Sequence, residues 1–159
     1  MKWYDLVRNP ELKEEALSLG FDKVFSFEEV NAFEGGSLEK NRKIVRKKKA
    51  LLVDPVVKGK EFDSAVAQVA KDNNVTIVFT LKRLLEAHGY ERARLLRAEI
   101  SAIQLCLKKK VNFIICSGAE DEYDLRQPLI LSRVGLVFGL TLPKSKWVVG
   151  KAYEAGDVV

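Results

Sequence analysis

The fold of this chain is decided by residues 75–116, VTIVFTLKRLLEAHGYERARLLRAEISAIQLCLKKKVNFIIC. The two ends of this stretch, VTIVF and VNFIIC, are almost continuous apolar runs of strand length. Such runs are typical of strands that are covered on both faces, as in a parallel sheet. Between them, residues 89–110 have the apolar spacing of a core helix. The stretch therefore predicts a strand, a helix and a second, parallel strand.

The expected helix at 89–110 has two different sides. The side expected to face the sheet carries apolar residues three or four positions apart: Leu96, Ile100, Ile103 and Leu107. The opposite side is polar and basic over the same length: Arg94, Arg97, Ser101, Gln104 and Lys108. Charged outer faces are the usual solvated surface of such helices, but a continuous basic line is also what contact with phosphates requires. Both interpretations stay open.

The same alternation continues on either side of the central stretch. Strands are expected at 2–7, 22–27, 50–56, 75–81 and 111–116, and helices at 9–20, 37–49, 61–74, 89–110 and from Pro128 onward. About five to six βα units fit, whereas a complete eight-unit barrel usually needs roughly 200 residues or more. We predict a single α/β domain over residues 1–159, with parallel βα units forming a shortened or incomplete TIM-like barrel. The glycine pair at 35–36 suggests a flexible loop.

Composition narrows the function classes. Lysine and arginine number 27 against 22 acidic residues, which gives a net charge of +5 and favours a polyanionic partner. Cys106 and Cys116 are too few for a disulfide framework or a four-thiolate zinc site, so we expect reduced packing residues. No run of eighteen apolar residues and no apolar leader occurs, which predicts a cytoplasmic protein without a membrane contact.

Polar residues gather where two expected strands end, the edge at which α/β folds bind ligands. These residues are Lys82 and Arg83 after VTIVFTL, and Ser117, Asp124 and Arg126 after VNFIIC. Asp124 is suited to capping free backbone N–H groups. Arg126 stands just before a helix start, where a cation opposes the helix dipole, so it favours a bound anion or a carboxylate partner.

Arg92 falls on the apolar side of the expected helix, in its first turn, near the same strand ends. Two interpretations stay open for it. It either faces a ligand at the strand ends or pairs with Glu99 or a loop carbonyl.

Three motifs carry a resemblance to a known family: YERARLLR at 90–97, CSGAEDEYDLRQP at 116–128 and VGLVFGL at 134–140. With the closing LPKSKW at 142–147, they resemble protein component 3 of archaeal ribonuclease P, the family that includes the eukaryotic thirty-kilodalton subunit. The similarity runs from residue 61 onward, and residues 35–55 resemble the middle segment of the family more loosely. The front half is shorter than in the family, as if one or two βα units were missing before residue 50.

The resemblance implies a barrel-like protein that assists a catalytic RNA in removing 5′ leaders from precursor tRNA, paired with a second, smaller protein subunit. Arg92, Arg97 and Arg126 match the family pattern, while Lys82 and Arg83 stand where the family tends to place arginine and then proline. No catalytic residue, metal or cofactor is expected. The residues expected to bind RNA or the partner are Lys82, Arg83, Arg92, Arg94, Arg97, Lys108, Ser117 and Arg126.

Three other function classes stand beside this one. A plain protein-interaction scaffold, in which a partner covers the unpaired strand edges of the shortened barrel, is compatible with it. A metal-dependent phosphoesterase of similar barrel type needs several histidines, and the chain has one, His88. A stand-alone α/β enzyme acting on a phosphorylated small molecule at Lys82, Arg92 and Arg126 remains the second candidate.

Overall fold

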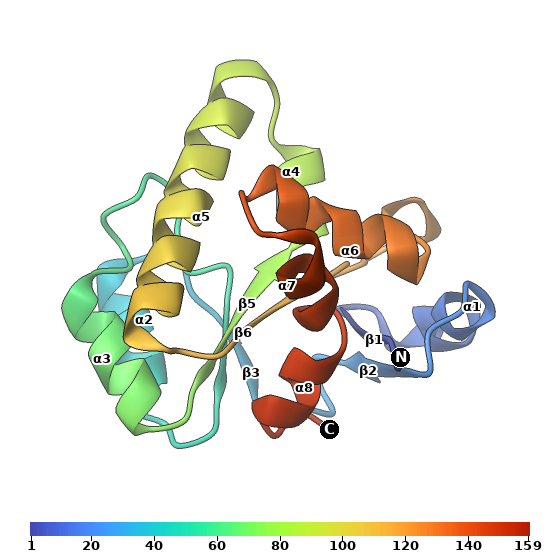
Figure 1. Cartoon of the computed structure of the whole chain (residues 1–159), viewed down its shortest axis with the longest axis horizontal. Coiled ribbons are helices and arrows are strands. Elements are labelled where there is room, and N and C mark those ends of the chain that lie inside the picture. Colours follow the sequence, from blue (N-terminus) through green and yellow to red (C-terminus); the bar gives the residue numbers. More distant parts are fainter.

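The computed structural model describes residues 1–159 (Figure 1). The strands are β1 (Tyr4–Val7), β2 (Lys23–Ser26), β3 (Ala32–Glu34), β4 (Leu51–Val53), β5 (Thr76–Thr80) and β6 (Phe113–Cys116). The helices are α1 (Lys13–Ser18), α2 (Leu38–Val45), α3 (Ser64–Asp72), α4 (Leu81–Glu86), α5 (Gly89–Lys109), α6 (Pro128–Val137), α7 (Leu142–Trp147) and α8 (Lys151–Ala155). Two short 3-10 helices, η1 (Pro10–Leu12) and η2 (Glu122–Asp124), complete the set.

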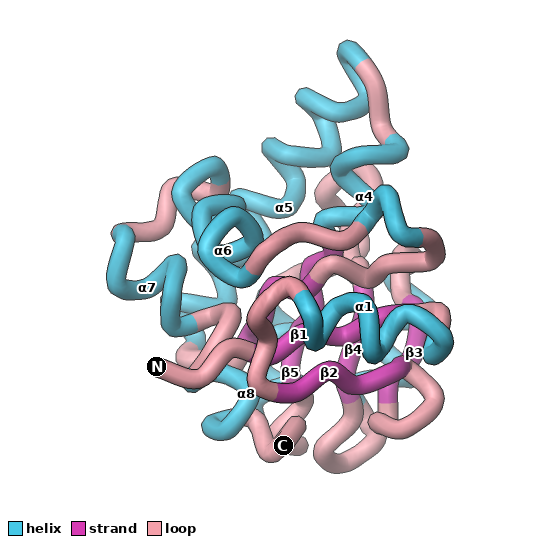
Figure 2. The backbone as a smooth tube through the Cα atoms, turned by 90° about the vertical axis from the view of Figure 1, so that its right-hand side faces the viewer, coloured by secondary structure: helices cyan, strands magenta, loops and turns pink.

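Every strand pairing is parallel, as the sequence predicts. β1 pairs with β2, and β3, β4, β5 and β6 form a four-stranded sheet in that order. Helices cover the outer side of this sheet, with α2, α3 and α5 on one flank and α6 and α7 on the other (Figure 1). In Figure 2, α1 lies over β1 and β2. The α/β architecture of parallel βα units in a shortened TIM-like barrel is therefore confirmed.

The barrel is incomplete because the β1–β2 pair forms no ladder with either end of the four-stranded sheet, neither at β3 nor at β6. In the gap between β1 and β6, the residues after α7 take the place of a ladder. Tyr4 N–H donates to the carbonyl of Val149 at 3.1 Å, and Ile115 N–H donates to that of Val148 at 3.1 Å. At the other end of the gap, Gly118 N–H donates to the Leu6 carbonyl at 2.9 Å. The chain thus satisfies these strand edges without a further strand.

Strands β1, β4, β5 and β6 are buried on both faces, and their successive side chains belong to two cores. Leu52, Ile77 and Phe113 belong to the larger core between the sheet and the helices. Their strand neighbours Val53 and Val78 belong to a smaller core on the inner side. This two-sided burial is the physical reason for the continuous apolar runs in the sequence.

Helix α8 fills the inner core. Tyr153 is fully buried there, and its hydroxyl donates to the Ile115 carbonyl at 2.9 Å. Its ring lies 5.5 Å from that of Tyr4, whose hydroxyl donates to Glu154 at 2.7 Å. Part of the barrel interior is therefore occupied by a helix rather than by further strands.

The core-facing side of α5 differs from the prediction. The buried residues are Leu95, Ala98, Glu99, Ala102, Ile103 and Cys106, while Leu107 is 43% exposed. Leu96 and Ile100 are only partly buried, at the margin of the larger core. The prediction was based on large apolar side chains, whereas much of the contact is made by alanines. Small residues allow close helix packing, so the contact side is rotated toward them.

The glycine pair lies in a loop between β3 and α2, as predicted, but Gly35 is closely packed. Strand β3 precedes it, and Gly35 N–H extends the ladder by donating to the Val53 carbonyl at 2.8 Å. A Cβ at Gly35 would collide with Asn41 Oδ1 and with Leu52 Cδ1. The glycine is required for close packing rather than for mobility.

Cys106 and Cys116 are fully buried in the two cores, which confirms their packing role. None of the helices combines the length and the apolar composition that a bilayer crossing requires.

Candidate functional site

The strand ends form a polar rim around Arg8, which directly follows β1. Its Nε donates to Glu34 at 2.8 Å, and its Nη2 donates to Asp54 at 3.0 Å. Its Nη1 donates to the Gly118 carbonyl at 3.1 Å. Burial alone would lower the pKa of Arg8, but the hydrogen bonds and charges of Glu34 and Asp54 raise it. Arg8 therefore joins the ends of β3, β4 and β6 as a permanent cation.

Asp54 is the buried partner in this arrangement and is 2% exposed. Its carboxylate accepts the backbone N–H of Thr80 at 3.0 Å and the Thr80 hydroxyl at 2.7 Å. Burial raises the pKa of Asp54, and the Thr80 hydrogen bonds and the Arg8 charge act in the opposite direction. The end of β4 is thus fixed to the end of β5.

Lys82 lies at the rim, as predicted, but its ammonium group is already paired with carboxylates of the chain. Its Nζ lies 3.0 Å from Asp124, 3.4 Å from Glu86 and 4.0 Å from Glu120. The hydrogen bond to Asp124 raises the pKa of Lys82. The carboxylate of Asp124 also accepts the N–H groups of Glu120 and Asp121, which precede it in the chain. The predicted capping of the helix at Pro128 is wrong, because no side chain caps the start of α6. Lys82 therefore holds the loop after β6 to α4.

The rim encloses a cavity of about 250 Å³ without any apolar lining residue. Its lining residues are Arg8, Glu34, Asp54, Arg83, Glu86 and Glu120. With Lys82 and Asp124 beside it, carboxylates outnumber basic side chains in this region. A surplus of carboxylates repels phosphate, so the geometry gives no support to a phosphate-binding pocket at the rim.

Arg92 and Arg126 do not join this cavity. Arg92 is exposed, contrary to its predicted inward position, and it donates to the carbonyls of Leu84, Leu85 and Ala87. This contact with loop carbonyls was one of the two interpretations left open. Arg126 is half-buried and donates to the carbonyls of Tyr123 and Leu125. Neither guanidinium pairs with a carboxylate of the chain, which was one of the partners expected for Arg126.

Ser117 is fully buried, and its polar groups bond within the protein. Its hydroxyl donates to Asp5 at 2.6 Å, and its backbone N–H donates to the same carboxylate at 2.7 Å. No surface of Ser117 is left for RNA. Of the four predicted rim cations, Arg83 lines the cavity, whereas Lys82, Arg92 and Arg126 bond to separate parts of the chain. With Ser117 buried, the predicted set does not converge on one place.

The outward line of α5 lies where the sequence places it. Arg97, Ser101, Gln104 and Lys108 are exposed and Arg94 is half-buried. In Figure 1 this helix runs along the outside of the molecule from the strand-end side toward the opposite end. The line gives the chain an extended basic surface that no carboxylate rim encloses.

Of the six residues that line the rim cavity, only Arg83 is predicted from the sequence. Arg8 and Asp54, which make the central ion pair, are not. A signal was available, because each directly follows an apolar strand run, as Lys82 and Ser117 do. Glu99 could not have been found in this way. It is 1% exposed, neither carboxyl oxygen has a hydrogen-bond partner, and burial raises its pKa to about 9.

No group of three or more histidine, cysteine, aspartate or glutamate side chains is placed to hold a metal ion.

Comparison with known proteins places the chain in a family. The family model described as RNase P subunit p30 matches residues 18–155, which extends the similarity well before residue 61. Ribonuclease P protein component 3 of Thermococcus gammatolerans is 33% identical over 115 residues, which are 71% of this chain and 54% of the relative. The protein of the same name from Methanosarcina mazei is 31% identical over 142 residues, 86% of this chain and 59% of the relative.

The chain spans about half the length of the curated relatives it matches. A chain of a solved structure, described as the cryo-EM structure of archaeal Ribonuclease P with mature tRNA, has the same fold with a TM-score of 0.75. It is 24% identical, and the match covers 98% of this chain and 80% of that one. Because the family model covers most of the sequence, the chain belongs to the RNase P subunit p30 family.

Proposed function

We propose that the chain is a protein subunit of an archaeal ribonuclease P ribonucleoprotein, which removes 5′ leaders from precursor tRNA. The observation that carries this proposal is the family match over residues 18–155. The fold shared with a chain of archaeal Ribonuclease P supports it. The compartment of such a complex is the cytoplasm.

In this proposal the protein supplies binding surface and the RNA supplies the chemistry. The rim cavity has no group placed to hold a metal, and its titratable side chains are engaged with one another. RNA contact falls to the outward line of α5 instead, where Arg94, Arg97 and Lys108 are free of the carboxylates that surround Arg8 and Lys82. A stand-alone enzyme acting at Lys82, Arg92 and Arg126 has no such support, because these three side chains bond to separate parts of the chain.

A smaller protein subunit is the proposed partner. Helix α6 and the start of α7 carry several exposed large apolar residues: Leu129, Ile130, Leu136, Val137 and Leu142. Apolar side chains gathered on one part of a surface are characteristic of protein contacts. This is a reason to expect a protein partner beside the RNA.

Reconstitution tests the proposal. We expect the catalytic RNA and its companion proteins to cleave precursor tRNA faster when this chain is included. Chain freed of RNA should not cleave with magnesium, zinc or manganese. Multiple-turnover cleavage by the protein alone, or no effect on the assembled enzyme, would contradict the proposed function.

A further inference from the structure

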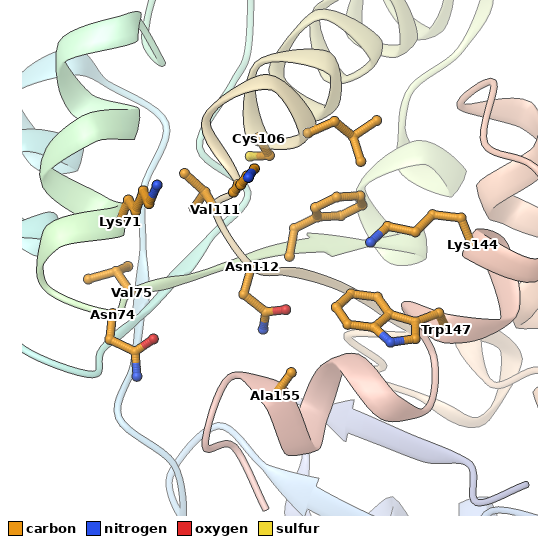
Figure 3. Close-up of a pocket in the computed structure, with 12 residues that line it drawn as sticks. Lys71, Asn74, Val75, Cys106, Val111, Asn112, Lys144, Trp147 and Ala155 are labelled. Atoms are coloured by element: carbon orange, nitrogen blue, oxygen red, sulfur yellow. The ribbon is translucent and has the colours of Figure 1, made fainter.

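At the end of the molecule opposite the rim lies a pocket of about 490 Å³, shown in Figure 3. It is bounded by the last turns of α3 and α5, the start of β6, and helices α7 and α8. Lys71, Lys110 and Lys144 are among its lining residues, together with Asn112 and Trp147. We call it the lysine pocket. In contrast to the rim cavity, it has no acidic lining residue.

Helix electrostatics account for some of these lysines. Lys71 is in the last turn of α3 and Lys110 caps the C-terminus of α5, where a cation interacts favourably with the helix dipole. Lys110, however, adopts the left-handed conformation, with φ 59°. Glycine or asparagine usually occupies that position, so the lysine is kept there at a conformational cost.

Lys144 has no such explanation. It is central in the six-residue helix α7, close to both of its ends, so the dipole of so short a helix does not account for it. Burial lowers its pKa, and no carboxylate offsets that effect. Its ammonium lies 3.7 Å from the centre of the Trp147 ring, and Figure 3 shows it pointing into the pocket. The indole stabilises the ammonium through a cation–π contact without neutralising it.

Asn112 adds an unpaired acceptor. Its Nδ2 donates to the Ala152 carbonyl at 2.9 Å and to the Thr76 hydroxyl at 3.2 Å. Because a carbonyl can only accept, this pairing fixes the amide orientation. The Oδ1 atom is buried and has no hydrogen-bond partner, which costs about 1–3 kcal/mol. A donor group of a ligand would remove that cost after a side chain of the pocket wall has moved.

We propose that the lysine pocket binds a nucleotide of a single-stranded RNA segment, with the lysines on the phosphate oxygens and the Trp147 indole against the base. Cationic side chains beside an aromatic face are the combination that single-stranded nucleic acid requires. A ribose hydroxyl or a base amine is the donor that Asn112 Oδ1 lacks. The inference rests on the proposed function, because it specifies where RNA meets this subunit.

The pocket continues the basic line of α5. Lys108 ends that line, and its neighbours Leu107 and Lys110 line the pocket. A strand held on the outer face of α5 is thereby directed to the pocket. On binding, Lys144 moves from the indole to a phosphate, and the base takes its place on the ring.

Fluorescence of Trp147 tests the inference directly. The full chain with Trp3→Phe has Trp147 as its single tryptophan, since the chain contains two. An adenylate RNA hexamer is the probe, and AMP, inorganic phosphate and polyglutamate are the comparisons. We expect the hexamer to quench the fluorescence and to bind more tightly than the other three.

Two variants identify the lysines, and one variant controls for charge. Lys144→Gln and Lys71→Gln should each weaken hexamer binding by about tenfold and flatten the log-log salt dependence by about 0.7, the value for one phosphate contact on a single strand. Lys146→Gln removes the same charge from α7 outside the pocket lining and should change neither quantity. Melting curves show whether each variant folds, and Lys71→Gln carries the test if Lys144→Gln does not.

Every other outcome overturns either the pocket assignment or the proposed function. Equal loss in Lys146→Gln would indicate a general charge effect. Equal binding of AMP would assign the pocket to free nucleotides, and equal binding of polyglutamate would assign it to an acidic protein segment. If reconstituted ribonuclease P depends on this chain while Lys144→Gln and Lys71→Gln bind the hexamer normally, the proposed function stands and the pocket assignment fails. If hexamer binding behaves as expected but the chain has no effect on the enzyme, the proposed function fails instead.

Discussion

Asp5 accepts two hydrogen bonds from Ser117, one from its backbone N–H at 2.7 Å and one from its hydroxyl at 2.6 Å. Asp54 repeats this arrangement with Thr80. In each pair, a buried carboxylate fixes the end of the neighbouring strand. The difference is that Asp54 also has Arg8, whereas Asp5 has no cation in hydrogen-bond contact.

Asp5→Asn tests how much stability the protein loses when the Asp5 carboxylate ionises without a cation beside it. Burial raises the pKa of Asp5 to about 6 from an ordinary value of 3.8, although the Ser117 hydrogen bonds lower it. A folded-state pKa above the unfolded value means that stability is fully present below pH 3.8 and declines as pH rises to about 6. The asparagine stays neutral, so it should gain up to about 3 kcal/mol relative to wild type between these pH values.

Urea unfolding of both proteins from pH 3.5 to 8 measures this difference. Below the window, the loss of one acceptor should leave Asp5→Asn equal to or less stable than wild type. A difference that does not change with pH would show that Asp5 is ionised at the same pH in the folded and unfolded states.

Glu99→Gln should stabilise the protein at neutral and alkaline pH. The pKa of Glu99 is about 9 against an ordinary 4.5, chiefly because of burial. Stability is therefore lost progressively as pH rises from about 4.5 to 9, and the glutamine variant lacks that loss. We expect a gain of about 1 to 3 kcal/mol at pH 7. Glu91→Gln, on the exposed start of α5, controls for the loss of one charge in the same thermal unfolding series.

Arg92→Ala should loosen α4 while leaving the rim in place. The guanidinium donates to the carbonyls of Leu84, Leu85 and Ala87, which close the C-terminal end of that helix. Loss of these bonds should cost about 1 kcal/mol, and amide hydrogen exchange should accelerate at 81–87. Arg97→Ala is the matched variant, because Arg97 is exposed on the same helix. Equal exchange in the two variants would remove the proposed role of Arg92.

The basic line of α5 should affect RNA binding and leave stability unchanged. Arg94→Gln, Arg97→Gln and Lys108→Gln should each weaken binding of the ribonuclease P RNA and lower its salt dependence by about 0.7 to 0.9 per lost phosphate contact. The free energy of unfolding should change by less than about 0.5 kcal/mol. Filter binding at several salt concentrations measures the first effect, with the exposed Lys2→Gln as control. Unchanged affinity in all three would make this line ordinary solvated surface.

The strands and the long helix could be predicted because their physics is local. β5 and β6 are buried on both faces, and the continuous apolar runs VTIVF and VNFIIC indicate this burial directly. β3 could not be found, because three residues of moderate burial give no periodic signal. The core side of α5 was misplaced for a related reason: Ala98 and Ala102 look neutral in sequence yet make the contact.

The site was harder to predict than the fold. Lys82, Arg83 and Ser117 do lie at the strand ends, as their positions after β5 and β6 indicate. Their partners come from remote parts of the chain. The sequence does not show that Ser117 donates to Asp5 or that Lys82 pairs with Asp124. An exposed cation and one neutralised by three carboxylates look alike in sequence.

The way the chain fills the gap beside β1 has a consequence for the order of folding. Tyr4 is bonded to Val149 and Glu154, the latter 150 positions away. The packing of β1 therefore depends on residues far along the chain, and the inner core stays unfilled until α8 has been synthesised. Pairings of such large sequence separation form slowly, so the nascent chain should remain open to other proteins until then. Completion of the inner core thus follows the synthesis of α8 rather than that of any earlier βα unit.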